Sequence, residues 1–148
     1  MAVGDLITAD YQAELRTTLM GPSTNYEITK IEVPPAQTVK NDLRKLLADG
    51  SFQGAHYKAP IVVTLTLNVL GSTETTLRSR LDTLETAWAP SATDLTFVLR
   101  LPSWGKKSLS GRPVAFDPGE LTPEAVAALK IFGVRAQFEA GTPTWTQL

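Results

Sequence analysis

The fold is decided by the stretch from Pro60 to Leu101, PIVVTLTLNVLGSTETTLRSRLDTLETAWAPSATDLTFVLRL. Its first segment after the proline, Ile61–Leu70, has Ile, Val or Leu at every odd-numbered position, whereas Thr or Asn occupies most of the even-numbered positions. Side chains alternate between the two faces of a strand. This period of two therefore predicts a long strand with one face on a core and the other face partly in water.

The following segment, residues 74–88, has helical periodicity. Large apolar side chains recur there at steps of four, three and four residues: Leu77, Leu81, Leu84 and Trp88. This spacing places them in one narrow stripe along a helix, with Thr73 positioned to cap the first turn and Pro90 just beyond the end. We predict one amphipathic α-helix over residues 74–88, packed on the sheet through this stripe.

A second strand follows the helix. In Leu95–Leu101 the odd-numbered residues are Leu, Phe, Leu and Leu, and Pro102 limits the segment. Alternation again predicts one core face. A strand, an amphipathic helix and another strand therefore form the central unit of the chain.

The rest of the chain is predicted mainly as strands. Residues 1–20 fit either a short strand at 5–8 or a helix with Tyr11, Leu15 and Leu19 on one side, and we favour strand pairing there. Further strands are expected at residues 26–33, 111–116 and 131–140, the last with Phe132, Val134, Ala136 and Phe138 on its core face. Residues 103–110 read as a polar loop. A short helix is expected to begin at Thr122–Pro123 and to run to Lys130.

Composition indicates one folded domain. The chain has 148 residues, of which 43% are hydrophobic and 20% are charged. Its net charge of −1 gives no electrostatic argument for nucleic acid, and the lack of cysteine excludes disulfides and thiolate metal sites. No apolar run approaches the ~20 residues of a membrane span. The first residues lack the features of a signal peptide, so we expect no Sec-type export.

No catalytic or cofactor constellation is recognisable, and we predict that the protein is not an enzyme. The only histidine, His56, lies in an expected loop and is interpreted as a surface residue. The glycines around residues 50–54 lack the lysine of a phosphate-binding loop. Asp117, Glu120 and Glu124 lie beside turns or a helix start, where capping is the expected role. Lys106–Lys107 with Trp104 and Arg112 could touch phosphate, although a solvated loop is favoured.

Three segments of the sequence together carry a resemblance to a known protein family. The first is the connection 50–57, GSFQGAHY, which leads into the strand Ile61–Leu70. The second is that strand followed by Gly71 and the helix containing LRSRLDTL at residues 77–84. The third is Gly111-Arg112-Pro113 with the later VRAQFEA at 134–140 and PTW at 143–145. Together these segments resemble the N-terminal domain of the distal tail proteins of long-tailed bacteriophages, although Thr142 stands in place of an acidic residue.

The resemblance implies a mainly β fold, a tail-tube-like β-sandwich or split barrel with one packed helix, in a single domain. It implies a structural virion protein that forms a ring, usually hexameric, at the distal end of a long tail. Its partners would be itself, the tube protein and the hub or tip proteins, with DNA passing through the lumen without specific binding. The chain would be assembled in the host cytoplasm and located in the virion tail, with no cofactor and no membrane contact. The alternative is a stand-alone β-sandwich module that binds carbohydrate or peptide, which a cluster of exposed Trp104, Tyr57 and Trp145 would favour.

A long extended connection is expected over residues 34–60, with one or two helical turns within 41–48. Connections of this length are uncommon inside a compact domain unless they are functional or reach a neighbour. Its large apolar side chains are costly to leave in water. The candidate inter-subunit contacts are Leu43, Leu46, Leu47, Phe52 and Tyr57.

Overall fold

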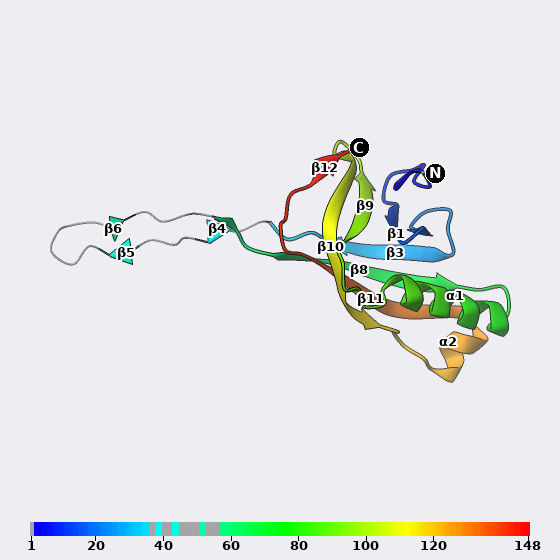
Figure 1. Cartoon of the computed structure of the whole chain (residues 1–148). Coiled ribbons are helices and arrows are strands. Elements are labelled where there is room, and N and C mark those ends of the chain that lie inside the picture. Colours follow the sequence, from blue (N-terminus) through cyan, green and yellow to red (C-terminus); the bar gives the residue numbers. More distant parts are fainter. Residues whose placement is uncertain (1, 36–37, 40–42, 45–50, 53–56) are drawn as a thin grey trace.

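Two antiparallel β-sheets that share one long strand make up the body of the protein (Figure 1). This computed structural model describes residues 2–35, 38–39, 43–44, 51–52 and 57–148. The first sheet contains β2 (Thr18–Met20), β1 (Ala13–Leu15), β9 (Leu95–Leu101), the first half of β10 (Gly105–Asp117) and β12 (Thr146–Gln147). The second sheet contains the other half of β10, β11 (Lys130–Ala140), β8 (Ile61–Leu70) and β3 (Tyr26–Glu32). The prediction of a mainly β fold is confirmed.

Strand β10 changes sheets at Gly111. Residues 105–111 pair with β9, ending at Gly111 opposite Leu95, and residues 112–117 pair with β11. A Cβ atom on Gly111 would overlap the carbonyl oxygen of Glu139, so only glycine fits this corner. The prediction of a loop at 103–110 is therefore wrong from Gly105 onward, where β10 begins. The backbone there pairs with β9 on one side and β12 on the other, while Leu109 points into the core.

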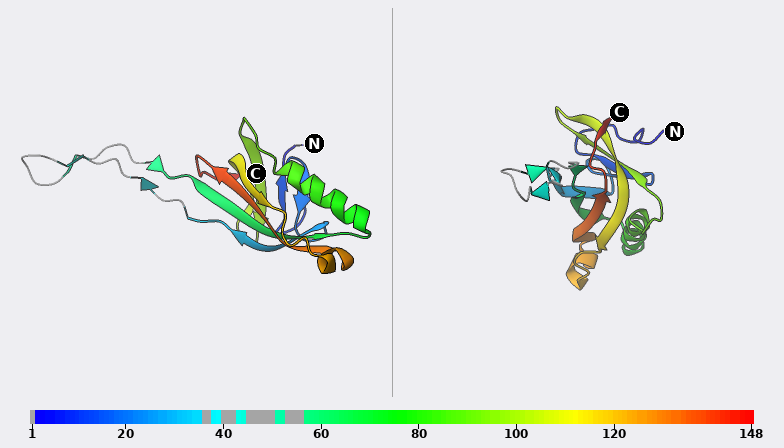
Figure 2. Two further views of the ribbon diagram at one scale, coloured as in Figure 1. Left: turned by 90° about the horizontal axis from the view of Figure 1, so that it is seen from below. Right: turned by 60° about the vertical axis from the view of Figure 1, so that its left-hand side comes forward.

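Helix α1 (Glu74–Ala87) joins the two sheets, as Figure 2 shows from two directions. Its predicted stripe is confirmed, because Leu77, Leu81, Leu84 and Trp88 are all buried. The indole Nε1 of Trp88 donates to the backbone oxygen of Gln137 at 3.0 Å. On the opposite sheet, the guanidinium of Arg16 donates to the oxygen atoms of Thr86 and Ala89. The helix is thus fastened to both sheets.

A β-bulge moves Phe132 out of the predicted core face. Ile131 pairs with Val69 but Val134 pairs with Leu67, so one extra residue enters β11 between them. Ile131 is buried in place of Phe132, which is 44% exposed. The expectation for Phe132 is therefore wrong, whereas Val134, Ala136 and Phe138 are buried as predicted. Beyond the bulge, β11 pairs with β8 in regular register from Val134 to Ala140.

The N-terminal region pairs as strands, but not where the sequence places them. Residues 5–8 are not in a strand, and β1 and β2 instead make a hairpin across Arg16 and Thr17. Both turn residues have positive φ, 48° and 62°, as a two-residue hairpin turn requires. Near the other end of the chain, α2 (Pro123–Ala127) is shorter than expected. It stops before Leu129, whose φ of 57° breaks the helix, and Lys130 already begins β11.

Short paired strands continue beyond β3 and β8, away from the two sheets (Figure 1). They are β4 (Thr38–Val39) with β7 (Tyr57–Lys58) and β5 (Leu43–Arg44) with β6 (Ser51–Phe52), and we call these four strands the arm. The helical turns expected within 41–48 are wrong at Leu43–Arg44, which is extended backbone. Leu46, Leu47 and His56 lie outside the described residues.

Candidate functional site: the open-side groove

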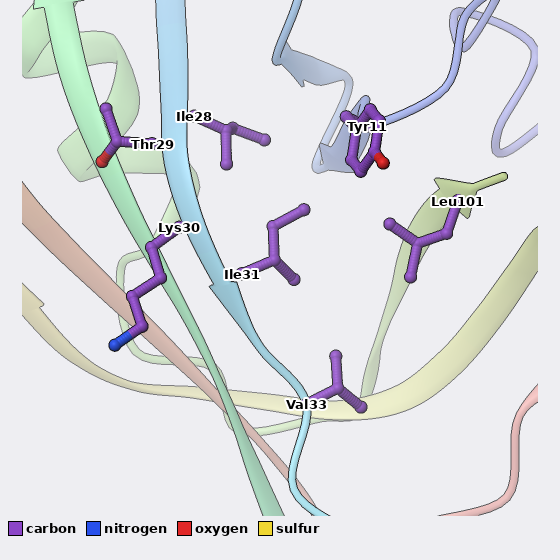
Figure 3. Close-up of a pocket in the computed structure, with 7 residues that line it drawn as sticks. All are labelled: Tyr11, Ile28, Thr29, Lys30, Ile31, Val33 and Leu101. Carbon is purple, nitrogen blue, oxygen red and sulfur yellow. The ribbon is translucent and has the colours of Figure 1, made fainter.

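An apolar groove runs along the side of the body where the second sheet ends in β3. It has a volume of about 440 Å³, and its apolar lining comes from Tyr11, Ile28, Ile31, Val33 and Leu101. Figure 3 shows Ile28 and Ile31 directed across the gap toward Tyr11 and Leu101, while Thr29 and Lys30 point to the other side of β3. A β-bulge explains this arrangement, because the extra residue between Ile28 and Lys30 brings Ile28 and Ile31, three positions apart, onto the same face of β3.

The groove continues past Val33 and Leu101, which also line a second hollow of about 400 Å³. The remaining walls of this hollow are Pro34, Pro35, Ile61, Trp104, Pro143 and Trp145. We call the two hollows together the open-side groove. Most of its lining side chains are apolar, which makes it the candidate contact site of the body.

Two tryptophans form the floor of the second hollow. The rings of Trp104 and Trp145 meet edge to face with centroids 4.7 Å apart, and Trp145 also lies edge-on to the buried ring of Phe97 at 6.5 Å. The ammonium of Lys107 sits 4.7 Å from the centroid of Trp104. Both tryptophans are half-buried against the core. They therefore do not present the exposed aromatic cluster that a sugar-binding module would use, and the side chain of Tyr57 is not described.

Strand β3 is an edge strand bordering this groove. Within the described part of the chain it pairs with β8 alone. A bulge at Thr29, whose hydroxyl donates to the backbone oxygen of Thr66 at 3.1 Å, twists the strand in its middle. Bulges and charges on an edge reduce unselective strand pairing, so contacts at this edge are expected to be selective.

Ion pairs flank the groove on both sides. Lys30 lies 3.0 Å from Glu32, and Arg100 lies 3.2 Å from Asp10. The hydrogen bond from Lys30, helped by its charge, lowers the pKa of Glu32. These pairs are solvent-exposed and contribute little to stability. Their effect is to leave the edges of the groove with balanced charge.

The acidic and basic residues noted in the sequence have structural roles or are separated. Asp117 accepts a hydrogen bond from the backbone N–H of Gly119 at 2.9 Å, and Thr122 rather than a carboxylate caps α2. Lys106 donates to the backbone oxygen of Gly4, while Arg112 pairs with Asp94. The expected basic–aromatic grouping thus reduces to Trp104 with Lys107.

Two features are absent from the described residues. No group of three or more His, Asp or Glu side chains could hold a metal ion among them. No helix in this part of the chain is long and apolar enough to cross a membrane. The groove was missed from the sequence, because its residues come from segments far apart in the chain and none of those segments has a motif.

Comparison with known proteins identifies the fold. No protein-family model matches the chain, and no curated protein sequence does. Among solved structures, it resembles the Dit protein (gp 19.1) of phage SPP1, described as a paradigm of the hub adsorption apparatus in phages that infect Gram-positive bacteria. The TM-score is 0.66 at 15% identity, covering 95% of this chain and 53% of that one. A chain of the phage p2 baseplate in its activated conformation with Sr matches with a TM-score of 0.65 at 10% identity, covering 91% and 44%.

The structural neighbours of this chain are therefore phage hub and baseplate proteins. The chain spans about half the length of each of these solved chains. At 15% and 10% identity the likeness is one of fold, and a fold alone does not define a function.

Proposed function

We propose that this protein is a structural subunit of a phage tail and forms a ring at the distal end that links the tail tube to the tail tip. The observation that carries the proposal is the match of 95% of the chain to a phage hub protein. The resemblance of three sequence segments to distal tail proteins agrees with the same role. The role requires no catalytic chemistry, so we propose that the protein is not an enzyme and resides in the virion tail.

The arm and the open-side groove support assembly into a ring. A ring subunit needs two different surfaces, one for each neighbour. The arm extends beyond the body, and the groove leaves apolar side chains open on the body itself. We propose that the arm reaches a neighbouring subunit through Leu43, Leu46, Leu47, Phe52 and Tyr57. A hexamer is the expected closed form, with the tube protein and tip proteins above and below it.

Electron microscopy and native mass spectrometry of the purified chain, alone and mixed with the tube protein of the same phage, test the proposal. Closed rings of uniform subunit number are expected, with or without the tube protein. A chain that stays monomeric in both samples at all concentrations would refute the structural role. Glycan and peptide binding assays on the same sample test the alternative of a stand-alone module, and no binding is expected because Trp104 and Trp145 pack on each other and on the core.

A further inference from the structure

A further hollow lies beside the N-terminal segment, at the end of the first sheet. It has a volume of about 540 Å³, which is in the range of ligand-binding clefts, roughly 300–1,000 Å³. Val3, Leu6 and Leu95 give it apolar walls, and Glu14 also lines it. We call it the Glu14 hollow.

The register of β1 explains why a hollow is present at this place. The pairing of β1 with β9 ends at Glu14 opposite Val98. Past this pair β1 enters its hairpin turn at Arg16–Thr17, whereas β9 extends back to Leu95 and pairs there with β10 on its other side. Within the described part of the chain, the first residues of β9 therefore have no strand partner on the β1 side, and the hollow opens beside them.

Glu14 places a carboxylate inside this hollow. It lies between Ala13 and Leu15, which both belong to the core, so its side chain points to the opposite face of the sheet. The residue is 3% exposed, and its Oε2 accepts from the backbone N–H of Gly4 at 3.0 Å. No described residue forms a salt bridge with it. A carboxylate removed from water without a cation beside it is costly, so Glu14 is suited to bind a cation.

The cationic residues near Glu14 are held by backbone oxygen atoms. Arg16, which also lines the hollow, donates to two backbone oxygens at the end of α1, at 3.1 and 3.0 Å. Lys106 donates to the backbone oxygen of Gly4 at 3.0 Å. The other carboxylate of the lining, Asp94, pairs with a cation outside the hollow, the guanidinium of Arg112. Glu14 is thus the acidic group of the lining that no described side chain neutralises by direct contact.

A lysine or arginine side chain of a partner has the chemistry that this hollow requires. Its head group would donate charge-assisted hydrogen bonds to the Glu14 carboxylate, and its methylene groups would lie along the apolar walls. The arm of this chain offers such a group, because β5 carries Arg44 on extended backbone. Residues 40–47, KNDLRKLL, include three cationic residues and one acidic residue.

The arm leaves the body in the direction away from the N-terminal segment, as Figure 1 and the left-hand view of Figure 2 show. The arm of one copy therefore does not reach the Glu14 hollow of the same copy. A contact between the arm and the hollow joins two different surfaces of two copies, and such a head-to-tail contact repeats into a ring when its rotation closes.

We propose that the Glu14 hollow of one copy receives Arg44 from the arm of the next copy. The guanidinium pairs with the Glu14 carboxylate, and the stem of Arg44 contacts the apolar walls. The inference rests on the proposed ring and adds one charged contact to the apolar contacts proposed for the arm.

A peptide of residues 38–47, TVKNDLRKLL, tests the contact without requiring a ring. Fluorescence anisotropy of the labelled peptide, titrated with the full-length chain, should show saturable binding. Glu14→Gln in the chain and Arg44→Gln in the peptide should each weaken binding by about tenfold or more, because each removes one charge of the pair. The two changes together should cost little more than either alone, since the pair acts as a unit. Glu85→Gln removes an acidic group on the exposed side of α1 and should bind as wild type.

A second variant leaves the buried carboxylate in place. Thr96 is an exposed residue of the hollow's lining, so Thr96→Lys adds a cation that repels the basic peptide and should also weaken binding by about tenfold. Ser79→Lys, at an exposed position on α1, adds the same charge elsewhere and should not. Circular dichroism establishes that each variant is folded.

The outcomes separate this contact from the proposed ring. Equal peptide binding by wild type, Glu14→Gln and Thr96→Lys, or no binding by any of them, overturns the contact. Rings that form unchanged in Glu14→Gln, seen by electron microscopy, also overturn it but leave the proposed ring standing. A wild-type chain that stays monomeric alone and with the tube protein overturns the ring, and with it the contact between copies.

Discussion

Tyr26 links the second sheet to helix α1. Its side chain is 6% exposed, and its hydroxyl donates to the backbone oxygen of Arg80 at 2.7 Å. Burial raises the pKa of Tyr26 above 10.0, although the nearby charge of Arg80 and a hydrogen bond with Thr83 act in the opposite direction. The unfolded chain therefore loses this proton at lower pH than the folded chain. Its contribution to stability is complete below the ordinary pKa and is lost as the pH rises through the folded pKa.

We expect Tyr26→Phe to lower the free energy of unfolding by about 1 kcal/mol near neutral pH, as loss of a buried hydrogen bond does. The difference between wild type and Tyr26→Phe should shrink above pH 10.0, the ordinary pKa of tyrosine. Urea titrations of both proteins at neutral and alkaline pH measure it. A difference that stays constant across this range would contradict the assignment.

Gly111 allows β10 to pass from one sheet to the other. Gly111→Ala should destabilise the protein by roughly 2 kcal/mol or more, because the new methyl group would overlap the backbone of Glu139 rather than a side chain that could move. Gly141→Ala is the matched control, since a Cβ there meets no atom within 4 Å. Thermal unfolding of both variants decides the point, and equal melting temperatures would show that the corner can relax.

Phe132 shows which residue-level features the sequence could not provide. Alternation from 132 to 138 predicts Phe132 in the core, and the bulge at Gly133, with φ of 74°, shifts it outward. On the neighbouring strand, Asn68 is 7% exposed although its face was predicted to be wet. The side-chain nitrogen of Asn68 donates to the carboxylate of Glu27 at 3.0 Å, and its side-chain oxygen accepts from the Gly133 N–H at 3.4 Å. A bulge depends on the partner strand's register, which no local pattern contains.

At the scale of elements, strong periodicity gave correct boundaries. The strands Ile61–Leu70 and Leu95–Leu101 and the helix beginning at Glu74 lie where their spacing predicts them. The strand Gly105–Asp117 was missed over its first half, because most of its inward-facing residues are small or polar and pairing on both sides holds it extended. The hairpin at Arg16–Thr17 was missed because its turn lacks the usual Asn-Gly signal.

Helix α1 gives a prediction at the same scale. Leu84 is fully buried in the stripe, so Leu84→Ala should lower the free energy of unfolding by roughly 2–5 kcal/mol. The salt bridge of Arg78 with Glu74, at 3.7 Å, is exposed to solvent, so Arg78→Ala should change the free energy of unfolding by about 0.5 kcal/mol or less. Denaturant melts compare the two. Equal losses would mean that the stripe is not what fastens α1 to the sheets.

At the scale of the whole molecule, the body and the arm have different relations to the core. The buried apolar cluster draws on both sheets and on α1. The candidate site could be predicted only in outline: the sequence indicated that residues 34–60 reach beyond a compact domain, and the arm lies outside the body (Figure 1). The open-side groove required the tertiary structure, because Tyr11, Val33, Leu101 and Trp145 meet only after the two sheets have formed.

Removal of the arm therefore separates folding from assembly. Replacing residues 36–58 with a short Gly/Ser turn should leave a folded monomer, because β3 and β8 already pair up to Glu32 and Thr64 and a short hairpin loop can join them. Circular dichroism should show an unchanged β-rich spectrum, and the melting temperature should stay close to that of wild type. Size-exclusion chromatography should show the loss of rings, since the proposed contacts from Leu43 to Tyr57 are gone. Rings that survive the deletion would refute the role of the arm, and an unfolded chain would show that the arm belongs to the subunit's own core.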